Sequence, residues 1–169
     1  FRPRAEGKVP GVIVLHILGG DFDLSRLFAR HLASHGVAAL FVKLPYYGPR
    51  QPAGVEVAMI SPDLEQTVAG MTQAVLDIRR AGAWLAAREE IDPDELGVMG
   101  VSLGGITAAL AGTAEPRFGK LFLMLAGGDV ARIGWDMPEA AEMRAAWEAK
   151  GGTLESLVRE ITPHRWTFV

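Results

Sequence analysis

The stretch that decides the fold lies at residues 96–105, LGVMGVSLGG. Its first six residues form a short apolar run, which predicts a strand, and a helix is expected from residues 106–111 onward. Ser102 stands between them, with Gly100 two residues before it and Gly104 two residues after it. A serine on such a sharp turn has its hydroxyl raised above the sheet edge, and small flanking residues let the chain reverse without a Cβ clash. The stretch therefore predicts a strand, a tight turn that presents a reactive serine, and a helix.

Strand and helix patterns alternate along the rest of the chain. Continuous apolar runs predict strands buried on both faces of a sheet, and amphipathic spacing of about 3.6 residues predicts helices. The predicted strands cover residues 12–18, 37–42, 96–101 and 120–126, and the predicted helices cover 24–35, 61–88, a stretch from 106 onward, 137–149 and 153–160. This alternation predicts an α/β fold with a doubly wound, mostly parallel sheet and helices on both faces.

Local signals set the ends of these elements. Asp21 or Asp23 is suited to cap the first helix, and Gly36 stands where a helix end favours a positive φ. Ser61 is the predicted cap of the long helix, because a proline and an acid follow it. Residues 91–94, IDPD, predict a turn before the third strand.

The composition is that of a folded protein without special partners. The 169 residues are 49% hydrophobic and 22% charged, with a net charge of −3, which suits one domain or part of a larger one. The scattered basic residues give no footprint for nucleic acid, and no apolar run approaches the roughly 20 residues of a membrane span. The absence of cysteine excludes disulfides and thiolate metal sites. We therefore expect no nucleic-acid or membrane partner and a cytoplasmic location.

A second element with chemical meaning is the turn at residues 16–20, HILGG, which ends the first predicted strand. Acyl transfer needs two backbone amides aimed at the oxygen that becomes negative. One comes from Leu103, directly after the serine, and the other from Leu18, with Ile17 as the second choice. Glycines that merely end a strand are the alternative interpretation of this turn. Three residues of the turn are assigned to the substrate-binding side of the site: His16 (as scaffold), Ile17 and Gly19.

The loop at residues 43–52 is expected at the same sheet edge, because the carboxyl ends of parallel strands meet there and open α/β sheets bind ligands there. Tyr46, Tyr47 and Arg50 are then candidates for lining an acyl or leaving-group pocket. The alternative is a rigid surface turn with packed tyrosines.

The stretch 12–20, with its H-x-x-G-G turn, and the block 91–105 resemble the α/β-hydrolase superfamily, and within it the dienelactone hydrolase and acetyl-esterase-like group. The resemblance covers most of residues 9–129. Related hydrolases insert helices that cap the site in the region that residues 130–165 occupy here, so a helical cap is implied for this region, with packing of its apolar residues in the core as the alternative. It implies a Ser-His-Asp hydrolase without a cofactor, in which Ser102 is the nucleophile and the Leu18 and Leu103 amides form the oxyanion hole.

The same resemblance implies that two catalytic partners lie elsewhere. In this family the acid follows the strand two after the serine turn, and the histidine follows the last strand. Here one complete strand follows the turn, and the next would begin at Trp166. The chain also opens at Phe1 and not at Met. We therefore expect residues 1–169 to form a single but partial hydrolase domain, incomplete at both ends, and a poor catalyst by itself.

Two residues of the chain are candidates to replace the missing partners. Asp129 follows the strand directly after the serine turn, and His164 comes later, so the order serine, acid, histidine is kept. The competing interpretations are a loop acid or helix cap for Asp129 and an exposed residue near the terminus for His164. His31 and His35 have a spacing that suits a metal, but a solvated or packed helix face is favoured, and no metal is expected.

The leading hypothesis is a serine hydrolase that cleaves a small carboxylic ester or lactone through an acyl-enzyme on Ser102. A serine peptidase of the prolyl-oligopeptidase kind is the first alternative, although the turn at residues 16–20 lacks the tyrosine that those enzymes usually carry there. A catalytically inactive hydrolase-fold module used for binding is the second.

Overall fold

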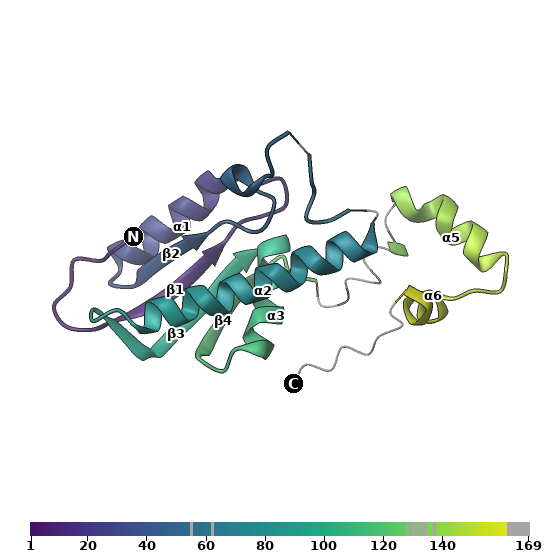
Figure 1. Cartoon of the computed structure of the whole chain (residues 1–169). Helices are drawn as coiled ribbons and strands as arrows, with labels where there is room; N and C mark the ends of the chain where they lie inside the picture. The colour runs from purple at the N-terminus through teal and green to yellow at the C-terminus, as the bar shows by residue number, and fades with distance from the viewer. Residues whose placement is uncertain are drawn as a thin grey trace. The chain divides into compact units, whose positions relative to one another are not determined.

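The computed structural model describes residues 1–54, 56–61, 63–127, 129, 132, 135–136 and 138–161. The chain divides into two compact units, Phe1–Ala126 and Gly127–Val169. Figure 1 shows the elements of both units. The single partial domain over residues 1–169 stays a prediction.

The first unit contains a four-stranded sheet in the order β2-β1-β3-β4. Each neighbouring pair of strands is parallel, which confirms the predicted α/β fold class. The strands are β1 (Val9–Leu15), β2 (Ala38–Val42), β3 (Ile91–Val101) and β4 (Phe118–Met124). The helices of this unit are α1 (Phe22–Ser34), α2 (Leu64–Ala86), α3 (Leu103–Ala114) and the short 3₁₀ helix η1 (Gly48–Arg50).

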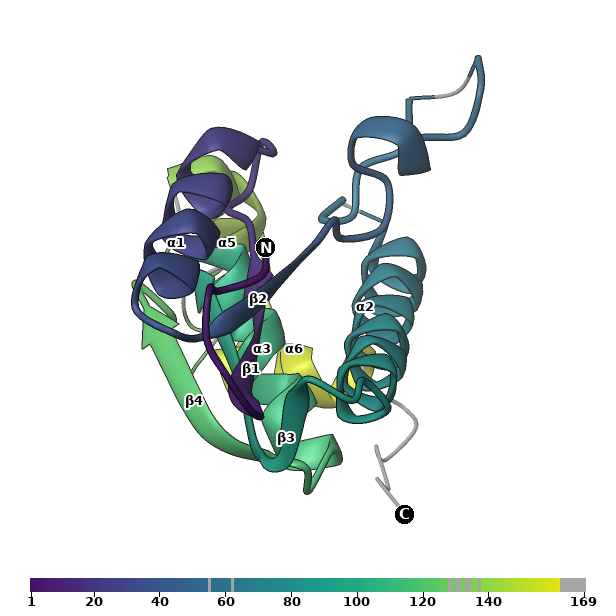
Figure 2. The ribbon, with the colours of Figure 1, turned by 90° about the vertical axis from the view of Figure 1, so that its left-hand side faces the viewer.

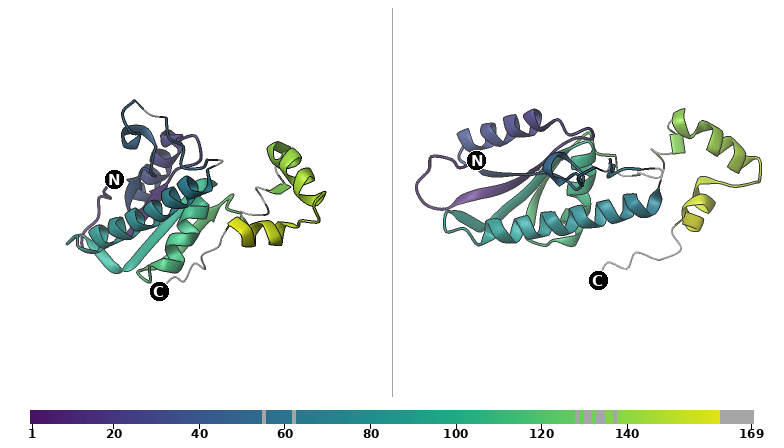
Figure 3. Two further views of the ribbon diagram at one scale, coloured as in Figure 1. Left: turned by 45° about the vertical axis from the view of Figure 1, so that its right-hand side comes forward. Right: turned by 45° about the horizontal axis from the view of Figure 1, so that its top comes forward.

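Helices cover both faces of the sheet, and alternate residues of one strand serve the two sides. Ile13 of β1 is buried in a cluster with Ile78 of α2 and Ala108 of α3. Val14, the next residue of β1, packs on the other face with Ala29 of α1. Figure 2 and the right-hand view of Figure 3 show α1 and α2 on opposite sides of the strands. This two-sided burial explains why β1 is apolar at successive positions.

The fourth strand is more exposed than the other three. β4 is an edge strand in the described sheet, and Leu121, Phe122 and Leu123 are exposed at 44%, 61% and 43%. α1 contacts β1 and β2, and Met124 at the end of β4 packs against the cluster that contains Ala29 of α1.

Several predicted element ends differ from the structure. Residues 91–94 do not form a separate turn but begin β3, where Ile91 pairs with Val9 across a register shift. α3 begins at Leu103, immediately after the serine. Asp63 and not Ser61 caps α2, because its carboxylate accepts the backbone N–H groups of the second and third following residues. Of the two candidates for α1, Asp21 is the cap. Gly36 has the predicted positive φ, at 82°.

The second unit contains the 3₁₀ helix η2 (Pro138–Ala140), α5 (Ala141–Glu148) and α6 (Leu154–Ile161). Trp147 connects the last two, because its indole N–H lies 3.1 Å from the carbonyl of Thr153 and 3.2 Å from the hydroxyl of Ser156. Helices in this region agree with the predicted pattern, whereas their role as a cap stays a prediction.

An ion cluster around a buried carboxylate joins α2 to the turn between α3 and β4. Glu115, at the end of α3, has a side chain that is only 4% exposed and accepts hydrogen bonds from Arg117 at 2.6 and 2.7 Å. Arg79 of α2 lies 3.4 Å from the same carboxylate. These contacts, those from Arg117 above all, lower the pKa of Glu115 from 4.5 to about 2.

Replacing this carboxylate is expected to destabilise the fold in a pH-dependent manner. Because the folded pKa lies below the ordinary value, the contribution of Glu115 is complete above about pH 5 and is lost as the pH falls towards 2. Glu115→Gln should lower the free energy of unfolding by about 2 kcal/mol at pH 7 and by about half of that or less at pH 3, as measured by urea denaturation. Glu95→Gln, which removes a half-exposed pair with Lys120, is the control and should cost less than about 1 kcal/mol. An effect of Glu115→Gln that is equal at pH 7 and pH 3 would contradict this assignment.

Candidate active site

Ser102 occupies a strained turn between β3 and α3. Its φ of 52° and ψ of −118° are unusual for a residue with a side chain. The conformation is held by the backbone, because the Ser102 N–H donates to the Met124 carbonyl at 2.8 Å and the Ser102 carbonyl accepts from the Ile106 N–H at 2.9 Å. The side chain is half-buried. Among the described residues, no side chain is hydrogen-bonded to its hydroxyl.

The glycines around Ser102 are required by close backbone packing. A Cβ on Gly100 would lie 2.2 Å from the carbonyl carbon of Gly104. A Cβ on Gly104 would lie 2.6 Å from the His16 carbonyl oxygen. The first turn of α3 therefore lies in direct backbone contact with β3 and with the end of β1. This contact explains why glycines stand two residues before and two residues after Ser102, as predicted from the sequence.

The turn after β1 meets this serine at the same edge of the sheet. β1 and β3 are parallel neighbours, with Leu15 paired to Gly100, so both chains leave the sheet side by side. The turn closes through a hydrogen bond from the Gly20 N–H to the Ile17 carbonyl at 3.2 Å, and both of its glycines have positive φ angles. Leu18 at its tip is 54% exposed, so this tip lies at the surface of the protein.

Backbone N–H groups at the start of α3 add a positive electrostatic potential at this edge. The first N–H groups of a helix, here beginning with Leu103, lack acceptors inside the helix, and the helix dipole places partial positive charge at its N-terminus. The side chain of Leu103 is buried, which fixes this first turn against the sheet.

His16 is a buried structural group of the turn. Its side chain is fully buried, its Nε2 accepts the Leu44 N–H at 3.0 Å, and its Nδ1 lies 2.8 Å from the Ile17 carbonyl. This pattern requires a neutral ring with its proton on Nδ1. Burial is the main cause of the lowered pKa of His16, which favours the same neutral form. His16 thus joins the turn to the loop that follows β2, whereas the sequence indicated only its position in the turn.

Aromatic rings surround the His16 side chain. The ring of Tyr47 lies edge-on at 4.6 Å between centroids, and that of Phe22 at 5.1 Å. Tyr47 also packs against Gly20, where an added Cβ would lie 3.1 Å from the tyrosine ring. Burial raises the pKa of the Tyr47 phenol, and a hydrogen bond with the Gly19 backbone opposes that rise. Tyr47 therefore supports the turn from the solvent side.

The remaining loop residues have structural contacts. Tyr46 has a φ of 64° and packs beside Gly70 of α2. Arg50 donates to the Lys43 carbonyl at 2.7 Å and to the Asp77 carboxylate at 2.5 Å, so it fixes the loop to α2. The guanidinium that was predicted to line a pocket makes both of these contacts. The Asp77 contact was not predicted, because an acid in the middle of a helix gives no local signal of its partner.

Leu125 is a further residue of this edge that the sequence did not single out. It follows the strand residue whose carbonyl accepts the Ser102 N–H, has a φ of 51° and is 86% exposed. A leucine at a strand end carries no signal of a positive φ.

The predicted substitute acid and base are not joined to Ser102 by any described contact. Asp129 lies in the second unit, where its carboxylate accepts the Arg132 N–H at 2.8 Å. His164 lies outside the described residues. His31 and His35 stack at 4.3 Å between centroids. In the part of the chain that the structure describes, no group of three or more acidic or histidine side chains is arranged to hold a metal ion, and no helix is long and apolar enough to cross a bilayer.

The fold has clear relatives among solved structures. Acetyl xylan esterase 1 from Thermoanaerobacterium sp. JW/SL YS485 has a TM-score of 0.63 at 21% identity, over 87% of this chain and 50% of that one. The acetyl xylan esterase from Paenibacillus sp. R4 has a TM-score of 0.62 at 20% identity, over 95% of this chain and 56% of that one. A dienelactone hydrolase-like promiscuous phosphotriesterase from metagenomic libraries has a TM-score of 0.52 at 26% identity, over 76% of this chain and 55% of that one. The chain thus spans about half the length of these proteins.

Comparison of sequences identifies further relatives of the chain. An uncharacterised protein of Mycobacterium tuberculosis is 37% identical over 82 residues, which are 47% of this chain and 19% of that protein. The family model of alpha/beta hydrolase domain containing 18 matches residues 4–129, which include β1 to β4, Ser102 and the turn at 16–20. The chain therefore belongs to the family of alpha/beta hydrolase domain containing 18, in the dienelactone hydrolase-like group of the α/β hydrolases.

Proposed function

We propose that this chain supplies the nucleophile and the oxyanion hole of a serine hydrolase that cleaves a small carboxylic ester or lactone. The observation that carries the proposal is the strained conformation of Ser102, held by backbone hydrogen bonds beside the open turn at residues 16–20. Strain of this kind persists only where the surrounding structure imposes it, and it occurs preferentially at functional sites.

In the proposed reaction, Ser102 Oγ attacks the ester carbonyl carbon while its proton passes to a general base. The carbonyl oxygen becomes negative and receives hydrogen bonds from the N–H groups of Leu103 and Leu18. Collapse of this tetrahedral species breaks the bond to the alcohol oxygen, which leaves with a proton, and the acyl group stays on Ser102. Water then attacks the acyl carbon and releases the acid. The positive end of the α3 dipole stabilises the oxyanion in both steps.

The exposed residues of this edge favour a small apolar acyl group. Leu18 and Leu125 are 54% and 86% exposed and follow the carboxyl ends of β1 and β4. A relative with 26% identity is a dienelactone hydrolase-like phosphotriesterase, which supports an ester-type substrate for the whole protein.

The nucleophile is tested by covalent labelling with a fluorophosphonate probe, carried out on the full-length protein, because the general base that activates the serine is expected outside residues 1–169. Labelling is expected to disappear in Ser102→Ala, because the probe reacts only with an activated hydroxyl beside an oxyanion hole. Ser34→Ala, which removes an exposed hydroxyl of α1, should label like the unchanged chain. Labelling that persists in Ser102→Ala would show that another residue is the nucleophile, and no labelling of the unchanged full-length protein would favour the inactive-module alternative.

His16 is expected to act as a positioning residue in the labelling reaction. His16→Phe removes the acceptor for the Leu44 N–H and should slow labelling about tenfold or more, since the turn is no longer fixed. His16→Gln, whose amide oxygen can accept that N–H, should recover part of the rate. His31→Gln, an exposed histidine of α1, is the control. Equal rates for the phenylalanine and glutamine variants would show that the hydrogen bond does not position the turn.

The neutral state of His16 also predicts a pH effect on stability. Its folded pKa lies below 6.5, so the unfolded chain takes up the proton first and the free energy of unfolding falls as the pH drops below about 6.5. His16→Gln should show a smaller fall between pH 7 and 5 in urea denaturation, whereas His31→Gln should follow the unchanged protein. A fall of equal size in His16→Gln would exclude His16 as its source.

A further inference from the structure

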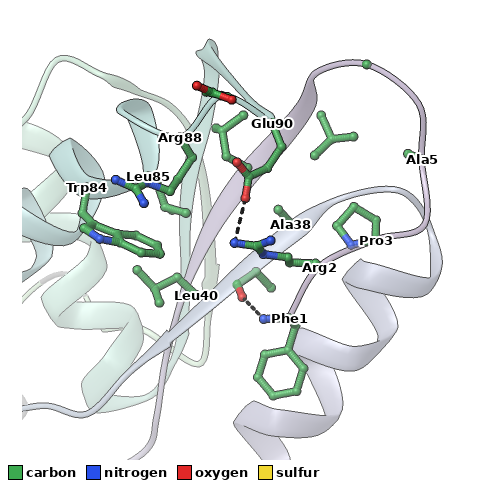
Figure 4. Close-up of a pocket in the computed structure, with 15 residues that line it drawn as sticks. Phe1, Arg2, Pro3, Ala5, Ala38, Leu40, Trp84, Leu85, Arg88 and Glu90 are labelled. Carbon is green, nitrogen blue, oxygen red and sulfur yellow. Dashed lines mark hydrogen bonds and ion pairs between the residues drawn. The ribbon is translucent and has the colours of Figure 1, made fainter.

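A cavity of about 430 Å³ lies at the edge of the sheet opposite to Ser102 (Figure 4). Val9 and Ile91, the first residues of β1 and β3, line it, whereas Ser102 follows the last residue of β3. The 11 residues of β3 separate the two places by roughly 35 Å, at about 3.3 Å per residue. The cavity is therefore separate from the proposed active site, and its volume lies within the range of small-molecule pockets, about 300–1,000 Å³.

The walls of this cavity are largely apolar. Ala38 and Leu40 of β2 and Leu85 of α2 form one part of the lining. Trp84 lines the cavity as well and is 50% exposed. A half-exposed indole beside aliphatic side chains suits a flat apolar ring.

Two arginines bring positive charge to the cavity. The guanidinium of Arg88 lies over the Trp84 ring, 4.6 Å from its centroid. Its Nε is buried and has no hydrogen-bond partner among the described residues. Arg2 belongs to the N-terminal segment and forms an ion pair with Glu90 at 3.1 Å. Figure 4 shows this ion pair together with Arg88.

We propose that this cavity binds a small flat carboxylic acid of the benzoate type. The ring would lie on the apolar wall beside Trp84, and the carboxylate would accept a hydrogen bond from the Arg88 guanidinium. Arg88 lines the cavity, and a hydrogen bond from a guanidinium to a charged acceptor is stronger than one to a neutral acceptor. Glu89 and Glu90 also line the cavity, which disfavours ligands that carry several negative charges.

The test follows the Trp84 indole N–H signal in ¹H–¹⁵N NMR spectra of the full chain, identified by its loss in Trp84→Phe. Benzoate is expected to shift this signal in a saturable manner. Benzamide, which has the same shape without the charge, should bind at least tenfold more weakly. Arg88→Met, which keeps the aliphatic part of the side chain, should weaken benzoate binding at least tenfold and leave benzamide binding unchanged.

A variant that gains affinity makes the result independent of misfolding. Glu90→Gln removes a negative charge from the cavity and frees Arg2, so it should strengthen benzoate binding severalfold. Arg30→Met, which changes an exposed arginine of α1, is the matched control and should bind as the unchanged chain does. Equal affinities for benzoate and benzamide, unchanged binding in Arg88→Met, or no shift of the Trp84 signal at millimolar benzoate would each overturn the proposal. None of these measurements depends on Ser102, so they stand apart from the labelling experiment.

Discussion

The close backbone contact among β1, β3 and α3 is the constraint on which the rest of the first unit depends. Gly100 and Gly104 leave no room for a Cβ, because the carbonyl groups of Gly104 and His16 already occupy that space. With the helix this near the sheet, the chain can pass from β3 to α3 only through a sharp turn, and Ser102 absorbs that turn in its positive φ. The strain at Ser102 is thus a consequence of how closely the helix is seated.

The second constraint is the neutral imidazole of His16, which holds two loops that the chain separates widely. Its two nitrogens bind the Ile17 carbonyl and the Leu44 N–H, so one ring connects the turn after β1 with the loop after β2. Arg50 then fixes the second loop to Asp77 of α2. The turn after β1 is therefore connected through the loop after β2 to α2.

The sequence was sufficient to predict the order of strands and helices and the turn at Ser102, because each depends on local periodicity or local sterics. Gly100 and Gly104 could be interpreted without a structure for that reason. The long-range contacts gave no such signal: the pair of Arg50 with Asp77 and the bond of His16 to Leu44 join residues 27 and 28 positions apart. Residues 91–94 were misassigned because a proline in a strand usually marks a turn, whereas here they form the start of β3 at its register shift.

The direction of the helix dipoles explains why an anion would be stabilised by different groups at the two edges of the sheet. α1 and α3 each begin just beyond the carboxyl end of a strand, so their N-terminal N–H groups gather at the edge that carries Ser102. Partial positive charge there comes from the backbone, and an oxyanion needs no cationic side chain. At the opposite edge α2 ends at Ala86 with partial negative charge. A carboxylate at that edge requires a side-chain cation, and Arg88, two residues beyond the helix end, provides one.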